Sequence, residues 1–389
     1  MKLASRLNKL QVSIYSQLAE LKAEIAQTGK SLIDLSIGSP DLPPPQEVKE
    51  LISRQALDDQ VYDYTLTRGT AEFREACANW YKRRFNVDLD PETEVLPTMG
   101  SQDGLAHIFW ALIDKGDSAL IPDPGYPIYS DGLTLAEGKI IPLPLLPANN
   151  FLPDFSQLSI KQADQAKLMI LNYPNNPTTA TANLEFFTQV VEFAYKHNII
   201  VCHDAAYTEL AYGGIRPVSF LQVDGAKEVG IEFHSLSKSF NMAGVRLGFA
   251  VGNSKVIKAL ETIKTNIDYG SFKPFLKAGA LALSNCQKTI ETNCQTYKRR
   301  SEIWINGCKE AGWEITQPLA TMFIWAPVPT EQDSLSFVMD LARKSGVILV
   351  PGAAFGQYGE GYVRIGLVQK EEVLEEAVKR IKTFLLKED

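Results

Sequence analysis

Lys238 has the most distinctive chemical setting in the sequence. It closely follows an apolar run at residues 231–234 and lies in a nearly uncharged stretch, a pattern typical of the end of a buried strand. A lysine amine in such surroundings has a lowered pKa and can form a Schiff base with an aldehyde. Groups of the kind that hold a phosphate flank it, at Ser235, Ser237 and Arg246. The alternative is a surface loop in which Lys238 is solvated.

A second polar segment, Asn172-Tyr-Pro-Asn-Asn-Pro-Thr178, follows another apolar run. Its two X-Pro bonds restrict the backbone, so the loop can present amide groups in a fixed geometry. Asn176 is the candidate to donate a hydrogen bond to a phenolate oxygen. If the segment stood alone, an Asn-Pro turn with only a structural role would be the simpler interpretation.

The third signal is Asp204 with Tyr207, directly after the apolar run at residues 199–203. A carboxylate at that point can keep a ring nitrogen protonated by charge pairing. The alternative is that Asp204 is a simple helix N-cap, because most aspartates after a strand have that role.

These residues need a scaffold, and short apolar runs alternate with helical patterns from about residue 97 onward. The strand candidates are residues 118–121, 139–142, 168–172, 199–203, 231–234 and 247–251. Helical stretches, such as 103–113 and 184–197, separate some of them. The alternation predicts an α/β fold with a mostly parallel sheet covered by helices on both faces. Ligands of such sheets bind at the carboxyl ends of the strands, where the three signals are expected.

The pattern changes beyond residue 272. A long helical stretch at 274–306, strands at 322–327, 347–350 and 362–367, and a closing amphipathic helix at 370–386 follow. Near the start, a helical period at residues 14–25 leads to the proline-rich segment 38–45, which cannot be a helix or a central strand. A chain of 389 residues exceeds one ordinary core. We predict a large domain at 46–275 and a smaller α+β domain formed by 1–45 and 276–389.

Composition excludes several classes of protein. The formal net charge of −7 argues against a nucleic-acid partner, which usually requires a basic surface. The five cysteines form no CxxC pair and, with the four histidines, no metal-ligand cluster, so no metal is expected. The N-terminus has no signal-peptide pattern, and no run has the roughly 20 apolar residues of a membrane helix. A cytoplasmic protein with no membrane partner is expected.

Together the three signals resemble a known family. Their order and spacing, with an arginine eight residues after Lys238, are similar to those of the fold-type I PLP-dependent aminotransferases of class I/II, over nearly the whole chain. Among these, the chain looks closest to bacterial aspartate-type and LL-diaminopimelate-type aminotransferases. The resemblance implies a seven-stranded type of sheet in the large domain. It also implies amino transfer between an L-amino acid and a 2-oxo acid.

The resemblance further implies that the cofactor is pyridoxal 5′-phosphate (PLP), bonded covalently by Lys238, which then moves protons. Asp204 would pair with the ring nitrogen, and Asn176 and Tyr207 would hydrogen-bond the ring hydroxyl oxygen. Tyr126 is similar to the aromatic residue that stacks on the ring. The implied phosphate ligands are Ser235, Ser237, Arg246 and the backbone N–H groups of Ser101 and Gln102, which open a helix.

Three further residues take implied roles in substrate binding and assembly. Arg364 resembles the arginine that binds the substrate α-carboxylate, with Gly38 and Asn176 beside it. Tyr64 resembles the tyrosine that reaches the phosphate of a neighbouring subunit, which implies a homodimer with shared sites. The side-chain pocket is expected to draw on Ile14 and Tyr15 of the N-terminal segment and on loops of both subunits.

One position departs from the family, because Thr179 stands where glycine is common. If that position requires a positive φ, Thr179 is strained. Two other functions remain open: a PLP-dependent β-elimination or C–S lysis on the same scaffold, and a regulatory PLP-binding module without turnover. The residues do not identify the amino donor or acceptor.

Overall fold

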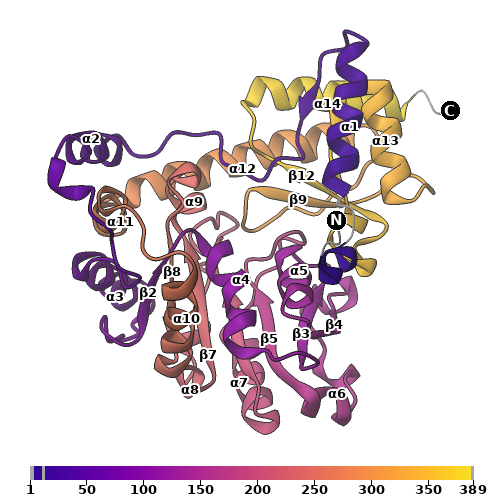
Figure 1. The fold of residues 1–389 in the computed structure, drawn as a ribbon. Coiled ribbons are helices and arrows are strands. Elements are labelled where there is room, and N and C mark those ends of the chain that lie inside the picture. The colour runs from indigo at the N-terminus through magenta and orange to yellow at the C-terminus, as the bar shows by residue number, and fades with distance from the viewer. Residues whose placement is uncertain (1–3, 11–13, 387–389) are drawn as a thin grey trace.

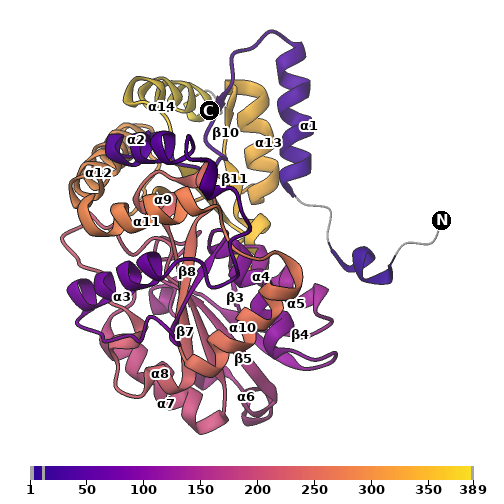
Figure 2. The same cartoon turned by 60° about the vertical axis from the view of Figure 1, so that its left-hand side comes forward.

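The computed structural model describes residues 4–10 and 14–386. Figures 1 and 2 show the fold from two sides. One large sheet flanked by helices occupies the lower half of Figure 1. Above it lie two small sheets and the helices of the two ends of the chain. None of the described helices combines the length and the apolar character needed to cross a membrane.

The large sheet has seven strands in the order β2-β8-β7-β6-β5-β3-β4. They are β2 (Val95–Thr98), β3 (Ser118–Asp123), β4 (Lys139–Pro144), β5 (Ala166–Asn172), β6 (Ile200–Asp204), β7 (Gly230–Ser235) and β8 (Gly248–Gly252). Strand β8 runs antiparallel to both of its neighbours, and the remaining pairs are parallel. The predicted α/β class, the mostly parallel sheet and its six predicted strands are confirmed.

Helices cover both faces of the sheet, and alternate residues of each strand point to opposite faces. In β5, Met169 and Leu171 join a hydrophobic cluster with residues of α3 (Ala71–Phe85), α7 (Leu184–His197) and α11 (Lys273–Asn285). Leu168 and Ile170 join another cluster with residues of α4 (Ser101–Leu112), α5 (Ile128–Leu135) and α10 (Ser254–Ile267). Burial on both faces explains the continuous apolar runs in the sequence.

The helices around the large sheet begin and end at recognisable caps. They are α2 (Gln46–Gln55), α3 (Ala71–Phe85), α4 (Ser101–Leu112), α5 (Ile128–Leu135), α6 (Ile160–Gln165), α7 (Leu184–His197), α8 (Ala226–Val229), α9 (Leu236–Ser239) and α10 (Ser254–Ile267). Helix α7, for example, follows Asn183, whose side chain accepts a hydrogen bond from Phe186 N. It ends at Asn198, which has a φ of 53°.

The smaller sheets join distant parts of the chain. Strands β9 (Phe323–Pro327), β11 (Val350–Pro351) and β12 (Tyr362–Gly366) form one sheet, and β1 (Ile33–Asp34) pairs in parallel with β10 (Val347–Ile348). Strands β1, β9, β10 and β12 form a third hydrophobic cluster with helices α1 (Ile14–Gln27), α12 (Gln287–Lys309), α13 (Ser334–Ser345) and α14 (Glu371–Leu385). The N-terminal segment therefore packs with the C-terminal third of the chain.

Two predicted elements are divided in the structure. The helical stretch at 274–306 is two helices, α11 (Lys273–Asn285) and α12, which meet at Cys286. The strand predicted at 347–350 is β10 and β11, which belong to different sheets. The junction at Cys286 contains neither proline nor glycine, and the apolar run at 347–350 is unbroken, so the sequence pattern reveals neither division.

Candidate functional site

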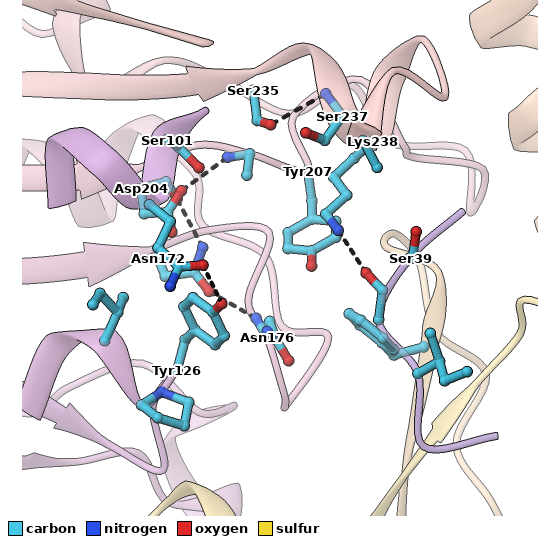
Figure 3. Close-up of a pocket in the computed structure, with 18 of the residues that line it drawn as sticks. Ser39, Ser101, Tyr126, Asn172, Asn176, Asp204, Tyr207, Ser235, Ser237 and Lys238 are labelled. Atoms are coloured by element: carbon cyan, nitrogen blue, oxygen red, sulfur yellow. Dashed lines mark hydrogen bonds between the residues drawn. The ribbon is translucent and has the colours of Figure 1, made fainter. Parts of the chain in front are cut away.

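A cavity of about 860 Å³ lies at the carboxyl ends of the parallel strands. All but one of the residues predicted to bind the cofactor or the substrate α-carboxylate line it: Gly38, Ser101, Gln102, Tyr126, Asn176, Asp204, Tyr207, Ser235, Ser237, Lys238, Arg246 and Arg364. The exception is Tyr64, which is 88% exposed on the surface and packs against the ring of Tyr269. In Figure 3, Tyr126 lies on one side of the cavity and Ser39 on the other.

Lys238 lies on the short helix α9, which directly follows β7. Its Nζ donates a hydrogen bond to the carbonyl oxygen of Gly38 at 2.5 Å, so the amine points into the cavity (Figure 3). Burial, followed by the positive charges of Arg364 and Arg246, lowers the pKa of Lys238 to about 8. A neutral, nucleophilic amine is therefore accessible near neutral pH.

Asp204 is the last residue of β6 and is 5% exposed. Its carboxylate accepts hydrogen bonds from the hydroxyl of Tyr129 at 2.7 Å and from Ala206 N at 3.2 Å. Burial raises the pKa of Asp204 above its ordinary value, and both of these donors are neutral. A carboxylate in this position is suited to a cationic partner in the cavity, such as a protonated ring nitrogen.

Two residues that support this site were not predicted from the sequence. Tyr129 donates directly to Asp204, and the side chain of Asn172 donates to the backbone carbonyl of Asp204 at 2.8 Å. Asn172 also accepts a hydrogen bond from Asn176 N at 2.7 Å. The available signals were positional, since Asn172 ends β5 and Tyr129 follows Tyr126 by three residues.

An anion-binding cradle lies beside these residues at the N-terminus of α4. Gly100 precedes the helix with a φ of 78°, and a Cβ at that position would lie 2.8 Å from Nη2 of Arg246. The guanidinium therefore sits against the positive end of the helix dipole. With the hydroxyl groups of Ser235 and Ser237, this arrangement fits a phosphate group.

A buried ion cluster fixes the start of α4. The carboxylate of Asp103 accepts hydrogen bonds from Met99 N at 2.9 Å and from Nζ of Lys264 at 2.6 Å. Asp103, His107 and Asp268 have the mutual spacing of metal ligands. Lys264 also donates to Asp268 at 2.9 Å, so its ammonium supplies the positive charge that this cluster needs.

Arg364 on β12 is 3% exposed and faces the cavity. Its Nη1 donates to Asn176 Oδ1 at 2.9 Å, and its Nη2 donates to the carbonyl of Ser36 at 3.1 Å. Its Nε has no hydrogen-bond partner within the described residues. The guanidinium also lies over the rings of Phe323 and Phe355. A buried guanidinium held only by neutral groups fits a carboxylate ligand.

Comparison with known proteins identifies the family to which the chain belongs. A profile described as aminotransferase class I and II matches residues 30–381. The LL-diaminopimelate aminotransferases of Dehalococcoides mccartyi and Moorella thermoacetica are 44% and 45% identical to the chain, over 99% and 98% of both sequences. The protein belongs to the class I and II aminotransferases. It is an enzyme that moves an amino group between an L-amino acid and a 2-oxo acid.

Solved structures agree with this assignment. Substrate-bound BacF from Bacillus subtilis superposes on the aminotransferase with a TM-score of 0.95 and 37% identity, covering 99% of this chain and 98% of that one. A probable N-succinyldiaminopimelate aminotransferase from Thermus thermophilus gives a TM-score of 0.91 and 37% identity, over 95% of this chain and all of the other. The fold of this aminotransferase is thus that of its family.

The position where Thr179 replaces the common glycine does have a positive φ, of 61°. Thr179 is β-branched, so this conformation is strained. Its N–H nonetheless donates to the carbonyl of Asn175 at 3.0 Å, and Asn176 still lines the cavity of the aminotransferase. Threonine at this position therefore raises the conformational free energy of the local backbone but does not move Asn176 out of the cavity.

Proposed function

We propose that this aminotransferase binds PLP in the cavity described above, with Lys238 as its covalent anchor. The observation that carries the proposal is the meeting of an amine of lowered pKa, a buried carboxylate and an anion cradle in one cavity. When bound, PLP supplies an aldehyde for the amine and a ring that accepts electrons from the substrate α-carbon.

Each of the cavity residues would then have a separate role in catalysis or in cofactor binding. The Nζ of Lys238 would hold the proton that leaves the α-carbon and deliver it again. Asp204 would keep the ring nitrogen protonated, and Asn176 and Tyr207 would hydrogen-bond the ring hydroxyl oxygen. Tyr126 would stack on the ring. The proposed phosphate ligands are Ser101, Gln102, Ser235, Ser237 and Arg246.

The proposed amino donor is LL-diaminopimelate, because several relatives that match nearly the whole chain carry that name. The test is a panel of donors, each offered with 2-oxoglutarate and with pyruvate, with the amino acid product quantified. We expect the highest kcat/KM with LL-diaminopimelate and amino transfer in every productive pair. A higher value for L-aspartate would contradict the donor, and keto acid release without an acceptor would indicate a lyase.

We also propose a homodimer, two domains and a cytoplasmic location. Leu57, Tyr62, Tyr64 and Leu66 are large hydrophobic residues that are 63–88% exposed, as expected of a surface that a second subunit covers. In that dimer Tyr64 would reach the partner's phosphate site. We propose domains at 46–275 and at 1–45 with 276–389. Separate hydrophobic clusters support a division into two domains, and residues of α11 at 276–285 pack in the cluster of the large sheet. Five free cysteines suit a reducing compartment.

Arg364→Lys is expected to weaken substrate binding while leaving the cofactor in place. Lysine cannot reproduce the two parallel hydrogen bonds of a guanidinium to a carboxylate. The loss in kcat/KM should correspond to about 2–4 kcal/mol for amino and keto acids. Steady-state kinetics with an amino acid and with its decarboxylated amine measure the effect. Equal, small changes for both donors would mean that another group binds the α-carboxylate.

Tyr129→Phe is expected to lower kcat about 10-fold, because removing one hydrogen bond to a charged group costs roughly 1.5 kcal/mol. The hydroxyl holds Asp204 in its ionised form, so its loss weakens the pairing with the ring nitrogen. Tyr173→Phe is the matched control, since its hydroxyl donates to the carbonyl of Phe151 and it does not line the cavity. An unchanged kcat in Tyr129→Phe would show that Asp204 needs no such support.

A further inference from the structure

Two charged side chains of the cavity have no part in the roles proposed above. They are Lys22 on α1 and Asp131 on α5, and they carry opposite charges. The other charged lining residues are Asp204, Lys238, Arg246 and Arg364. A cavity wall with one additional cation and one additional anion is suited to a ligand with both charges.

The two side chains come from different parts of the molecule. In Figure 1, helix α1 lies in the upper part beside α13, and helix α5 lies below it against the large sheet. Helix α5 begins directly after Tyr126 and Pro127, so Asp131 lies about one turn beyond the tyrosine on one cavity wall. Lys22 donates a hydrogen bond to Ser36, three residues before Ser39 on the other cavity wall. The two charges therefore face the cavity that contains Lys238 from different walls.

Lys22 retains hydrogen-bonding capacity toward the cavity. Its Nζ contacts Asp34 Oδ2 at 2.7 Å and Ser36 Oγ at 3.0 Å. An ammonium has three N–H donors, so these contacts leave one. The side chain is 30% exposed, which keeps that donor accessible. Asp34 and Ser36 thus hold the ammonium in place without saturating it.

Asp131 has an uncommitted carboxylate. Within residues 4–10 and 14–386, no group forms a hydrogen bond or an ion pair with its side chain, although its backbone N–H donates to Pro127 at 3.0 Å. An acidic residue in the first turn of a helix is ordinarily explained by the helix dipole. That explanation accounts for its place on α5 but requires no position on the cavity wall, which Asp131 has.

We propose that Lys22 and Asp131 form a subsite for the second amino acid head group of a diaminodicarboxylic substrate. Asp131 binds the distal ammonium, and Lys22 binds the distal carboxylate. The subsite rests on the proposed function and explains how this cavity selects a substrate that is zwitterionic at both ends. A charged head group that leaves water needs partners of opposite charge, and a donor without it leaves those partners unpaired.

Four donors separate the two contacts: LL-diaminopimelate, L-2-aminopimelate without the distal amine, L-lysine without the distal carboxylate, and L-norleucine without either. We expect Asp131→Asn to lower kcat/KM about 10–100-fold for LL-diaminopimelate and L-lysine only. Lys22→Gln, which can still hydrogen-bond Ser36, should lower it for LL-diaminopimelate and L-2-aminopimelate only. Glu185→Gln is the matched control, because Glu185 lies in the first turn of α7 and outside the cavity.

The outcomes distinguish the subsite from the donor assignment. If the wild-type enzyme uses LL-diaminopimelate but Asp131→Asn changes all four donors equally, or none, the subsite is wrong and the donor stands. If the wild-type enzyme does not use LL-diaminopimelate, both proposals fail. Thermal unfolding of each holoenzyme variant shows whether the variant is folded. If one variant is not folded, the other variant tests the subsite with the two donors that it is expected to affect.

Discussion

Replacing Lys238 by alanine is expected to abolish amino transfer and the covalent attachment of PLP. The amine is the group in the cavity whose lowered pKa makes it nucleophilic, and its Nζ points toward Gly38 where the substrate would lie. Losing both the covalent anchor and the proton carrier should reduce kcat by at least about 10⁴-fold. The measurement is steady-state turnover, together with protein mass after borohydride reduction in the presence of PLP.

The wild-type protein should gain the mass of reduced cofactor, and Lys238→Ala should not. Lys258→Ala is the matched control, since Lys258 is an exposed lysine on α10 that pairs only with Glu261 among the described residues. It should behave like the wild type in both measurements. Turnover by Lys238→Ala at a rate near that of the wild type would refute the proposed anchor.

Asp204→Asn is expected to lower kcat by about 10³–10⁴-fold while PLP remains bound. Asparagine keeps the shape of the side chain but has no charge, so it cannot hold the ring nitrogen in its protonated form. The phosphate cradle at α4 and Arg246 is untouched by the change, which preserves affinity for the cofactor. Single-turnover kinetics and the PLP content of the purified variant separate the two effects.

Asp123→Asn is a suitable control for this experiment. Asp123 also ends a strand of the large sheet, but its carboxylate accepts hydrogen bonds from Gln357 N and Tyr358 N and does not line the cavity. Its replacement should affect stability more than kcat. Full activity in Asp204→Asn would show that another group controls the ring nitrogen.

The main site residues were predictable because each ends or closely follows a strand. Asp204 ends β6, Lys238 and Asn176 come after β7 and β5, and the alternation of apolar runs placed those strands in a parallel sheet. The convergence of the three residues follows from this topology. Roles at individual cofactor atoms came from the family resemblance and not from the pattern.

The residues that were missed act through tertiary contacts. Tyr129 donates to a carboxylate 75 positions away, and Lys22 pairs with Asp34 across the turn between α1 and β1. Neither contact leaves a periodic or compositional trace in the sequence. Ile14, expected in the substrate pocket, instead packs on the small-sheet core, and the side chain of Tyr15 lies outside the described residues.

The prediction of secondary structure from the sequence failed where the local signals were weak. Strand β2 has four residues, includes Pro97 and pairs antiparallel with β8, so neither length nor composition marked it. The junction of α11 and α12 at Cys286 contains no proline or glycine. At residues 347–351 the chain passes from one sheet to another, which only the tertiary fold reveals.

The most direct test of the central claim is to follow the nitrogen itself. Purified holoenzyme is incubated with LL-diaminopimelate labelled with heavy nitrogen and with unlabelled 2-oxoglutarate, and the glutamate formed is analysed by mass spectrometry. Amino transfer through the Lys238 site predicts that the glutamate carries the label, that it forms in step with consumption of the donor, and that Lys238→Ala forms none. Labelled ammonium without labelled glutamate would contradict the account.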